Sequence, residues 1–431
     1  MPETFVPNFP HRHYHSYGVN NRRMVDVNPN LRVRAEDVAH VANRLGARSI
    51  MDVGSNLGGF LFFLEQFTQR TELLGVEGDA RFVAECQKVA SLLESKVQFR
   101  NKDIMALEPT TVHDAMILQN VYHYIFDKKG SHEPIFKQFA RHARSIIWYN
   151  PMNDSDPVIP QHANSNPNAD WSSYNHGAIF KAAMKAGFLH PLPLKLRFAG
   201  MGPAREHWLF VRDEVRPLCP SVVPLSEIGT TEIAVRDHFK NIHKVTADDR
   251  YFYKVFLTNQ HHQMDRLKSA VESGFFDRTI CEGLCYIVDQ DGKPVGYRQP
   301  RSTEAKFARE ALGTTVDRDF RRMLWILFSR MVRLDRFNHD VGRHNLVFDL
   351  ASSKPMMIDL ENVIDSASSG QRLSIYRVAP NENEVKSAEA NLQLFFPDIT
   401  VTIADRDPIT VLCDCLARST FVSTVDYTNM L

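Results

Sequence analysis

A short apolar strand, a glycine-containing turn and an apolar helix constrain this chain more than any other stretch. Residues 49–53 are mostly apolar, and Gly54 and Gly58 fall in the turn that follows them. Apolar residues then recur at helical spacing between 60 and 67. Glycine allows a tight turn and a close approach of the backbone to a ligand because it lacks a Cβ atom. The free N–H groups of the next helix would face that ligand, so the stretch predicts a nucleoside-binding unit.

An acidic residue follows the second predicted strand. Residues 72–77 end in Glu77, and an acid about 20 residues beyond the glycines can take both hydroxyls of a ribose. The turn itself reads D-x-G-x-N-x-G, from Asp52 to Gly58, whereas dinucleotide enzymes usually show G-x-G-x-x-G. This spacing resembles the first motif of the class I S-adenosylmethionine-dependent methyltransferases. Another Rossmann-like domain that uses a different nucleotide, or none, is the alternative.

The resemblance implies cofactor-binding roles for a set of residues. In that family the Asp and the glycines of the first motif hold the methionine end of S-adenosylmethionine, and the acid after the second strand holds the ribose. An acid after the third strand often contacts the adenine amine, although Asp103 could equally be a simple loop acid. The residues assigned to cofactor binding in this part of the chain are Asp52, Gly54, Asn56, Gly58, Glu77, Asp103 and Gln119.

Strand and helix patterns alternate through the first half of the chain. Alternation of this kind predicts an α/β fold, a Rossmann-like mostly parallel sheet with helices on both faces. The helix expected ahead of the first strand covers 36–47. The predicted strands are 49–53, 72–77, about 97–100, 114–119 and 145–149, followed by a final hairpin of 189–198 and 206–212. We therefore expect a methyltransferase domain over residues 1–213.

Two further stretches point to the acceptor. His123 follows the fourth predicted strand, where it would act as a base, hold an acceptor oxygen, or simply pack against a helix. The long polar stretch 150–176 is expected to form a lid on the acceptor side. Near the N-terminus, Tyr17 and several arginines, among them Arg34, would close over the cofactor, bind an anionic acceptor, or lie on the surface.

The second half of the chain carries a different pattern. A Pro-rich junction predicts a linker over 214–239, followed by a compact domain over 240–431. Lys254 lies in a predicted strand, and a helix is expected over 260–273. The pattern is completed by Asp340, an Asn five residues later, a strand, a turn, an apolar strand and Asp359. This order resembles the protein-kinase-like fold, which is α+β.

That resemblance implies the parts of a phosphoryl-transfer site. Asp340 would orient the acceptor hydroxyl and take its proton, while Asn345 and Asp359 would hold Mg²⁺ against the phosphates of ATP. Lys254 would contact the α and β phosphates. Glu272 would pair with Lys254, or Asp265 would.

The second pattern also departs from the family. Residues 242–249 contain no glycine where a Gly-rich loop is usual, and Gly342 replaces the helper lysine of the catalytic loop. Leu360 and Glu361 stand where Phe-Gly is usual. A degenerate domain without phosphoryl transfer and a chance match both stay open.

The two halves together resemble the bifunctional kinase–methyltransferases that cap O-antigen polysaccharides. The resemblance implies an enzyme that phosphorylates a saccharide or glycan hydroxyl with ATP and methylates the acceptor, or the new phosphate, with S-adenosylmethionine. The alternative is a methyltransferase whose kinase-like domain binds acceptor or nucleotide without phosphoryl transfer.

Charge, cysteine content and hydropathy limit the partners and the compartment. Acidic and basic residues balance at 51 each, which does not favour a broad nucleic-acid-binding surface. No apolar run is long enough to span a bilayer, and the N-terminus does not read as a signal peptide. Six cysteines in 431 residues do not make a disulfide scaffold, so we expect a cytoplasmic protein. Peripheral membrane contact and the oligomeric state stay open.

Overall fold

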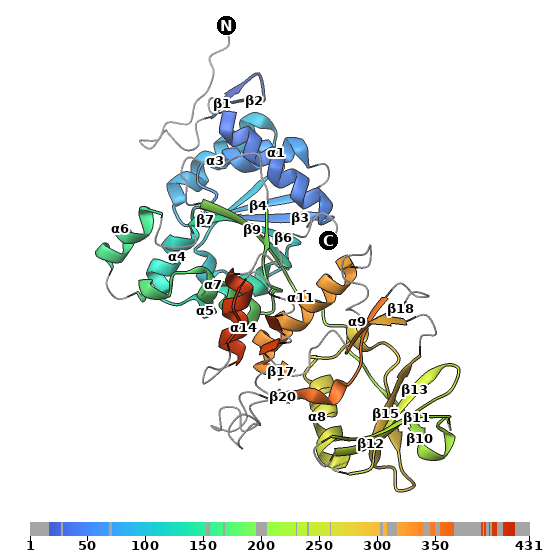
Figure 1. The fold of residues 1–431 in the computed structure, drawn as a ribbon. Helices are drawn as coiled ribbons and strands as arrows, with labels where there is room; N and C mark the ends of the chain where they lie inside the picture. Colours follow the sequence, from blue (N-terminus) through green and yellow to red (C-terminus); the bar gives the residue numbers. More distant parts are fainter. Residues whose placement is uncertain are drawn as a thin grey trace. The chain divides into compact units, whose positions relative to one another are not determined.

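The chain forms two compact units in the computed structural model (Figure 1). The first unit ends at Arg212 and the second begins at Asp213. The structure describes residues 17–26, 29–68, 71–151, 156–166, 169–194, 205–229, 231–238, 241–258, 260–301, 305–307, 317–338, 345–349, 354–365, 389–390, 392–393, 396, 399–402 and 408–418.

A seven-stranded sheet forms the centre of the first unit, in the order β5-β4-β3-β6-β7-β9-β8. Strands β3 to β7 run parallel to one another, whereas β9 is antiparallel to both β7 and β8. The strands are β3 (Ser49–Val53), β4 (Glu72–Glu77), β5 (Gln98–Asn101), β6 (Ala115–Gln119), β7 (Ser145–Pro151), β8 (Leu192–Pro193) and β9 (Arg205–Val211). The predicted α/β fold with a mostly parallel sheet is confirmed.

Helices cover both faces of this sheet. Figure 1 shows α1 and α3 on one face and α4, α5 and α7 on the other. All seven residues of β7 are buried, because a sheet covered on both sides turns each strand into a near-continuous apolar run. The helices are α1 (Pro29–Arg44), α2 (Gly59–Phe67), α3 (Ala80–Leu93), α4 (Tyr122–Lys129), α5 (His132–His142), α6 (Val158–Ser165) and α7 (His176–Lys185), with 3₁₀ turns η1 (Ile104–Ala106) and η2 (Trp171–Ser173). A hairpin, β1 (Tyr17–Asn20) and β2 (Arg23–Asp26), precedes them.

The order of the strands places the ligand crevice. The chain runs outward from β3 through β4 to β5 on one side, and through β6 to β7 on the other. The direction of winding therefore reverses between β3 and β6. Ligands of open α/β sheets bind at this point, beyond the carboxyl ends of the strands.

The second unit contains a six-stranded sheet in the order β10-β14-β15-β13-β12-β11. Its pairs are antiparallel except β10 and β14, which are parallel. The strands are β10 (Ser221–Pro224), β11 (Thr231–His238), β12 (Asn241–Ala247), β13 (Tyr251–Phe256), β14 (Cys285–Val288) and β15 (Pro294–Pro300).

The prediction of a linker over 214–239 is corrected by the structure. This stretch forms both edge strands of that sheet, β10 and β11. β10 has a single buried residue, and the outer strand β11 exposes Ile233 and Val235. Edge strands are covered on fewer sides than central ones, so they lack the buried periodicity by which a strand is recognised in sequence.

Helices and short strands complete the second unit. Helix α8 packs against β15 and against the 3₁₀ turn η4. The sheet β16-β18-β19 and the pair β17–β20 are both antiparallel. The elements are η3 (Leu225–Glu227), α8 (Gln260–Glu272), α9 (Arg278–Cys281), β16 (Ala305–Phe307), α11 (Asp317–Leu334), β17 (Arg336–Asn338), β18 (Leu346–Asp349), β19 (Lys354–Met357), η4 (Leu360–Asn362), β20 (Val363–Asp365) and α14 (Pro408–Arg418). The unit is α+β, as predicted.

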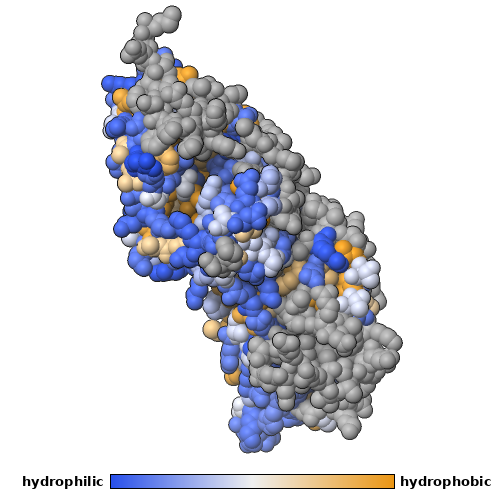
Figure 2. Space-filling view, turned by 90° about the vertical axis from the view of Figure 1, so that its left-hand side faces the viewer, coloured by the Kyte–Doolittle hydropathy of each residue, from blue (hydrophilic) through white to orange (hydrophobic). Residues whose placement is uncertain are grey.

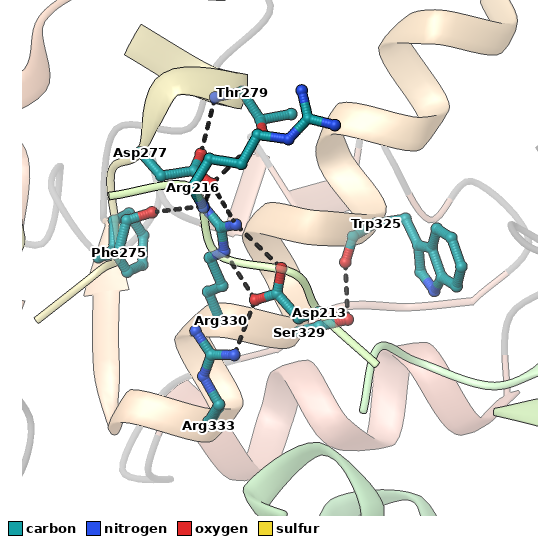
Figure 3. A network of polar contacts seen from close by, with 9 residues as sticks. All are labelled: Asp213, Arg216, Phe275, Asp277, Thr279, Trp325, Ser329, Arg330 and Arg333. Atoms are coloured by element: carbon teal, nitrogen blue, oxygen red, sulfur yellow. Dashed lines mark hydrogen bonds and ion pairs between the residues drawn. The ribbon is translucent and has the colours of Figure 1, made fainter. Parts of the chain in front are cut away.

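A buried ion network joins the beginning of the second unit to α11. The guanidinium of Arg330 donates to both carboxylate oxygens of Asp213, at 2.8 and 2.9 Å, and to Asp277 at 3.0 Å (Figure 3). It also donates to the carbonyl of Phe275 at 3.1 Å, while Arg333 lies 2.8 Å from Asp213. Arg330 is almost fully buried, so its charge is compensated by these partners rather than by water.

The surface drawn in Figure 2 is mostly hydrophilic where it is described, and hydrophobic residues form small separate areas on it. Within the described ranges, no helix combines the length and the apolar character that crossing a membrane requires. Most large apolar side chains of these ranges lie instead in the cores of the two units.

Candidate functional site

The turn after β3 has a backbone that suits glycine. Gly54 and Gly58 have φ values of +71° and +72°, and Asn56 between them has φ +50°. A Cβ atom at Gly54 would lie 2.7 Å from Cγ2 of Val121, and one at Gly58 would lie 2.7 Å from the ring of Phe99. Both the left-handed conformation and the lack of space therefore exclude larger residues.

The carbonyl groups of this turn are held from outside it. The hydroxyl of Tyr17 donates to the carbonyl of Leu57 at 2.6 Å, and the thiol of Cys86 donates to that of Asn56 at 3.1 Å. The N–H of Gly54 donates to the carbonyl of Val76 at 2.8 Å, which ties the turn to β4. The turn is thus fixed before any ligand arrives.

Glu77, the last residue of β4, is bonded to the same turn. One carboxylate oxygen accepts the N–H of Asn56 at 2.9 Å, and the other accepts the N–H of Asp79 at 3.0 Å. An ionised carboxylate has about four acceptor positions, so each oxygen keeps capacity for a further donor. Glu77 can therefore accept from two neighbouring hydroxyl groups without moving.

A cavity of about 660 Å³ lies over the carboxyl ends of these strands, within the size range of small-molecule sites. Seven residues that the sequence singled out line it: Arg34, Gly54, Asn56, Glu77, Asp103, Gln119 and His123. Asp52 and Gly58 are not among its lining residues. The volume and the carboxylate of Glu77 fit a nucleoside-bearing cofactor such as S-adenosylmethionine.

Asp52, on β3, is buried. Burial raises its pKa to about 8, and the nearby charge of Glu77 raises it too, whereas the guanidinium of Arg34 lowers it. Arg34 reaches the cavity from α1, and its Nη1 donates to the side-chain oxygen of Gln119 at 3.4 Å. A positive ligand group near Asp52 would favour the ionised carboxylate.

Asp103 lies where the sequence suggested, just beyond β5. One carboxylate oxygen caps the 3₁₀ turn η1 by accepting the N–H of Met105 at 2.9 Å. The other oxygen lies 3.7 Å from the ammonium of Lys128, which also lines the cavity. Its contact with an adenine amine stays a prediction.

His123 is buried on α4 and borders the cavity. Its ring centroid is 4.2 Å from that of Tyr124 and 5.2 Å from that of His162 on α6. Nδ1 of His162 lies 3.4 Å from the carboxylate of Asp127. Sequence analysis missed His162 and Asp127, because only folding brings α6 to α4. His162 therefore contacts both His123, which borders the cavity, and Asp127.

The segment that carries His123 is held by Asn150 of β7. The side-chain oxygen of Asn150 accepts the N–H groups of Val121 and Tyr122 at 2.8 and 3.0 Å, and its amide donates to the carbonyl of Leu118 at 2.9 Å. Asn150 is fully buried and was also missed. It fixes the start of α4 relative to the sheet.

A second group of charged residues lies in the second unit. The ammonium of Lys254, on β13, donates to Asp359 at 2.7 Å and to the carboxylate of Glu361. Burial lowers the pKa of Lys254, but the charges of Glu361 and Asp359 outweigh it and the pKa is raised. Asn345 is buried, and its carbonyl accepts the N–H of Ile358, which precedes Asp359. One or two carboxylates with substrate phosphates are a usual Mg²⁺ set, so Asp359 and Asn345 fit that ion.

The structure corrects the prediction that Glu272, or Asp265, pairs with Lys254. Glu272 is exposed at the end of α8, near Tyr286, and is not among the described partners of Lys254. Asp265, the other option, is also exposed. Glu361 takes the place expected for them. Asp340 lies outside the described residues, so its role stays a prediction.

No family model matches the chain, and no curated protein does. Similar solved structures include WbdD, a bifunctional kinase-methyltransferase, at 14% identity over 99% of this chain and 93% of that one, with a TM-score of 0.35. EvdMO1 is 21% identical over 44% of this chain, which spans 41% of EvdMO1, with a TM-score of 0.33. The plantazolicin methyltransferase BpumL, solved with S-adenosylhomocysteine (SAH), is 13% identical over 43% of this chain and 85% of its own, with a TM-score of 0.30. Likeness at this level bears on neither activity nor substrate.

Proposed function

We propose that this chain is a transferase with two sites, one for S-adenosylmethionine in the first unit and one for ATP and Mg²⁺ in the second. The observation that carries the first assignment is the position of Glu77. Its carboxylate is fixed by two backbone N–H groups at the rim of a 660 Å³ cavity. A rigid acceptor pair beside a glycine turn suits the two hydroxyls of a ribose.

Methyl transfer would use the chain's side chains as follows. Bound S-adenosylmethionine supplies an activated methyl group. Glu77 would hold the ribose, Asp103 the adenine amine, and the turn around Gly54 and Asn56 the methionine end. His123 would take the proton of the acceptor hydroxyl, since its buried ring borders the cavity.

Phosphoryl transfer would use the charged residues around Lys254 in the second unit. Lys254 would contact the α and β phosphates, Asp359 and Asn345 would hold Mg²⁺, and Asp340 would orient the acceptor hydroxyl. The proposal is supported by the position of Lys254 beside Asp359. Buried and paired groups of this kind are more typical of functional sites than of ordinary surfaces.

We propose a saccharide or glycan as the acceptor of both reactions. A saccharide offers the hydroxyl that phosphoryl transfer needs. If the methyl goes to the new phosphate, a cation must hold that phosphate in line, and Arg34 is a guanidinium already at the cavity.

A second candidate is a methyltransferase whose second unit binds acceptor or nucleotide without chemistry. It is favoured by residues 242–249, which lack glycine. The two candidates are separated by incubating the full chain with ATP labelled at the γ-phosphate and a panel of saccharides.

The proposal expects label in a saccharide product, and loss of that label in Asp359→Ala while the variant still binds SAH. Methyl transfer without any phosphoryl transfer in the wild type would favour the second candidate. Absence of both would overturn the proposal.

A further inference from the structure

The ammonium of Lys254 is surrounded by acids from one short segment. Asp359 and Glu361 are two residues apart, at and just after the start of η4, and both contact Lys254. The side chains of Lys254 and Glu361 are each only 8% exposed, whereas that of Asp359 is 41% exposed. The two acids therefore differ: Glu361 lies inside, and Asp359 faces the open side where a metal and phosphates would lie.

Glu361 is itself fixed by the sheet. The hydroxyl of Tyr297 donates to the second carboxylate oxygen of Glu361 at 2.9 Å, and the N–H of Leu360 donates to that hydroxyl at 3.3 Å. Tyr297 lies on β15 directly opposite Lys254 of β13 in the antiparallel register. Lys254, Tyr297 and Glu361 thus form a buried triad in which Glu361 contacts both of the others.

Helix α8 packs beside this triad without supplying an acid to it. The acids of α8 named above, Asp265 and Glu272, are exposed. Arg266 of α8 is partly buried, and burial lowers its pKa while the carboxylate of Glu361 opposes that effect. The charged residue of α8 that interacts with Glu361 is therefore a cation, Arg266. The sequence predicts the opposite arrangement, in which an acid of this helix faces Lys254.

We propose that Glu361 is the positioning residue for Lys254, and that it holds the ammonium in place independently of any acid on α8. This rests on the proposed nucleotide site. Asp359 would turn to Mg²⁺ when nucleotide binds, and Lys254 would stay oriented because Glu361 and Tyr297 keep their bonds. The ammonium of Lys254 then keeps the orientation that phosphate binding needs, wherever α8 lies.

Nucleotide binding to the full chain tests this, with calorimetric titrations of ADP and of adenosine. Since the proposed function has Lys254 contact phosphate and not the nucleoside, Glu361→Gln and Lys254→Met should each weaken ADP binding by about tenfold, with adenosine unchanged within about twofold. Glu361→Asp should recover part of the ADP affinity. Glu272→Gln should match the wild type for both ligands. Equal loss of ADP and adenosine in Glu361→Gln, or a loss in Glu272→Gln as large as in Glu361→Gln, would overturn the inference.

Repeating the ADP titrations with EDTA distinguishes the positioning role of Glu361 from a role as a metal ligand. The loss caused by Glu361→Gln should persist without metal, and its disappearance would assign Glu361 to the metal instead.

Melting temperatures of Lys254→Met, Glu361→Gln and the double variant test the pairing without any ligand. The double variant should melt no lower than the less stable single variant, because a buried charge left alone is the main loss. Additive shifts would overturn the pairing, whereas a wild type that binds no ADP would overturn the proposed function alone.

Discussion

Glu77 accepts the backbone N–H of Asn56 at 2.9 Å, so the acid that ends β4 is bonded to the turn that follows β3. The two features that the sequence marks as a nucleoside site are therefore one rigid assembly. Its second fixed bond, from the N–H of Asp79, leaves the carboxylate no freedom to swing away from a ribose.

Glu77→Gln should weaken binding of SAH, since one acceptor oxygen becomes a donor. Loss of one hydrogen bond to a charged acceptor corresponds to about 1.5–3 kcal/mol, or roughly ten- to a hundredfold in affinity. Calorimetric titration measures it. Glu72→Gln, at the exposed start of the same strand, is the matched control and should bind as the wild type does. Similar affinities for the two variants would contradict the assignment.

Tyr17→Phe should loosen the glycine turn. The substitution leaves the carbonyl of Leu57 without its 2.6 Å donor in a buried place, at a cost of about 1–3 kcal/mol in the free energy of unfolding. SAH affinity should fall with it, because the turn would have to be ordered on binding. Urea unfolding and a SAH titration check both effects, and a fully stable variant with unchanged affinity would speak against the role of Tyr17.

Asp52→Asn should change how stability depends on pH. The folded chain keeps the carboxyl proton of Asp52 up to a pKa of about 8, whereas the unfolded chain loses it near 3.8. Between these values the folded state binds the extra proton, so the free energy of unfolding falls as pH rises, by about 1.4 kcal/mol per pH unit at most. The variant lacks this loss.

Urea unfolding at several pH values should therefore show Asp52→Asn gaining on the wild type between about pH 4 and pH 8, the window between the two pKa values, with a constant difference below about pH 4. A difference between the two proteins that does not vary with pH would contradict the burial-raised pKa of Asp52.

Arg330→Met should destabilise the second unit strongly. Removing the guanidinium takes from the buried carboxylate of Asp277 its described ion-pair partner and leaves Asp213 with Arg333 alone, which costs about 3–5 kcal/mol. Arg322→Met, at an exposed position of the same helix, should cost no more than about 0.5 kcal/mol. Chemical unfolding of both variants makes the comparison, and equal stabilities would show that the network contributes little.

Local patterns in the sequence were enough for most of the first sheet. The apolar run at β3 and the acid that ends β4 lie within short windows, and their parallel pairing follows from alternation with helices. The strands predicted at 49–53 and 72–77 have the bounds of β3 and β4. Edge strands β10 and β11 were missed because exposure removes the periodicity that marks a strand.

Pairings between distant residues were not predictable in the same way. Glu361 is 107 positions from Lys254, and nothing near either residue signals the contact. The resemblance instead suggested Glu272, which the fold leaves exposed. His162 is a similar case, since its approach to His123 depends on where α6 packs. Such contacts follow from tertiary packing, which periodicity does not encode.

The central claim is that the chain holds two separate ligand sites, and calorimetry of the full chain tests it most directly. SAH and Mg²⁺ with ADP are titrated separately into the wild type, Glu77→Ala and Asp359→Ala. The account predicts that the wild type binds both ligands, that Glu77→Ala loses only SAH, and that Asp359→Ala loses only the magnesium nucleotide. A wild type that binds neither ligand, or a single substitution that abolishes both, would contradict it.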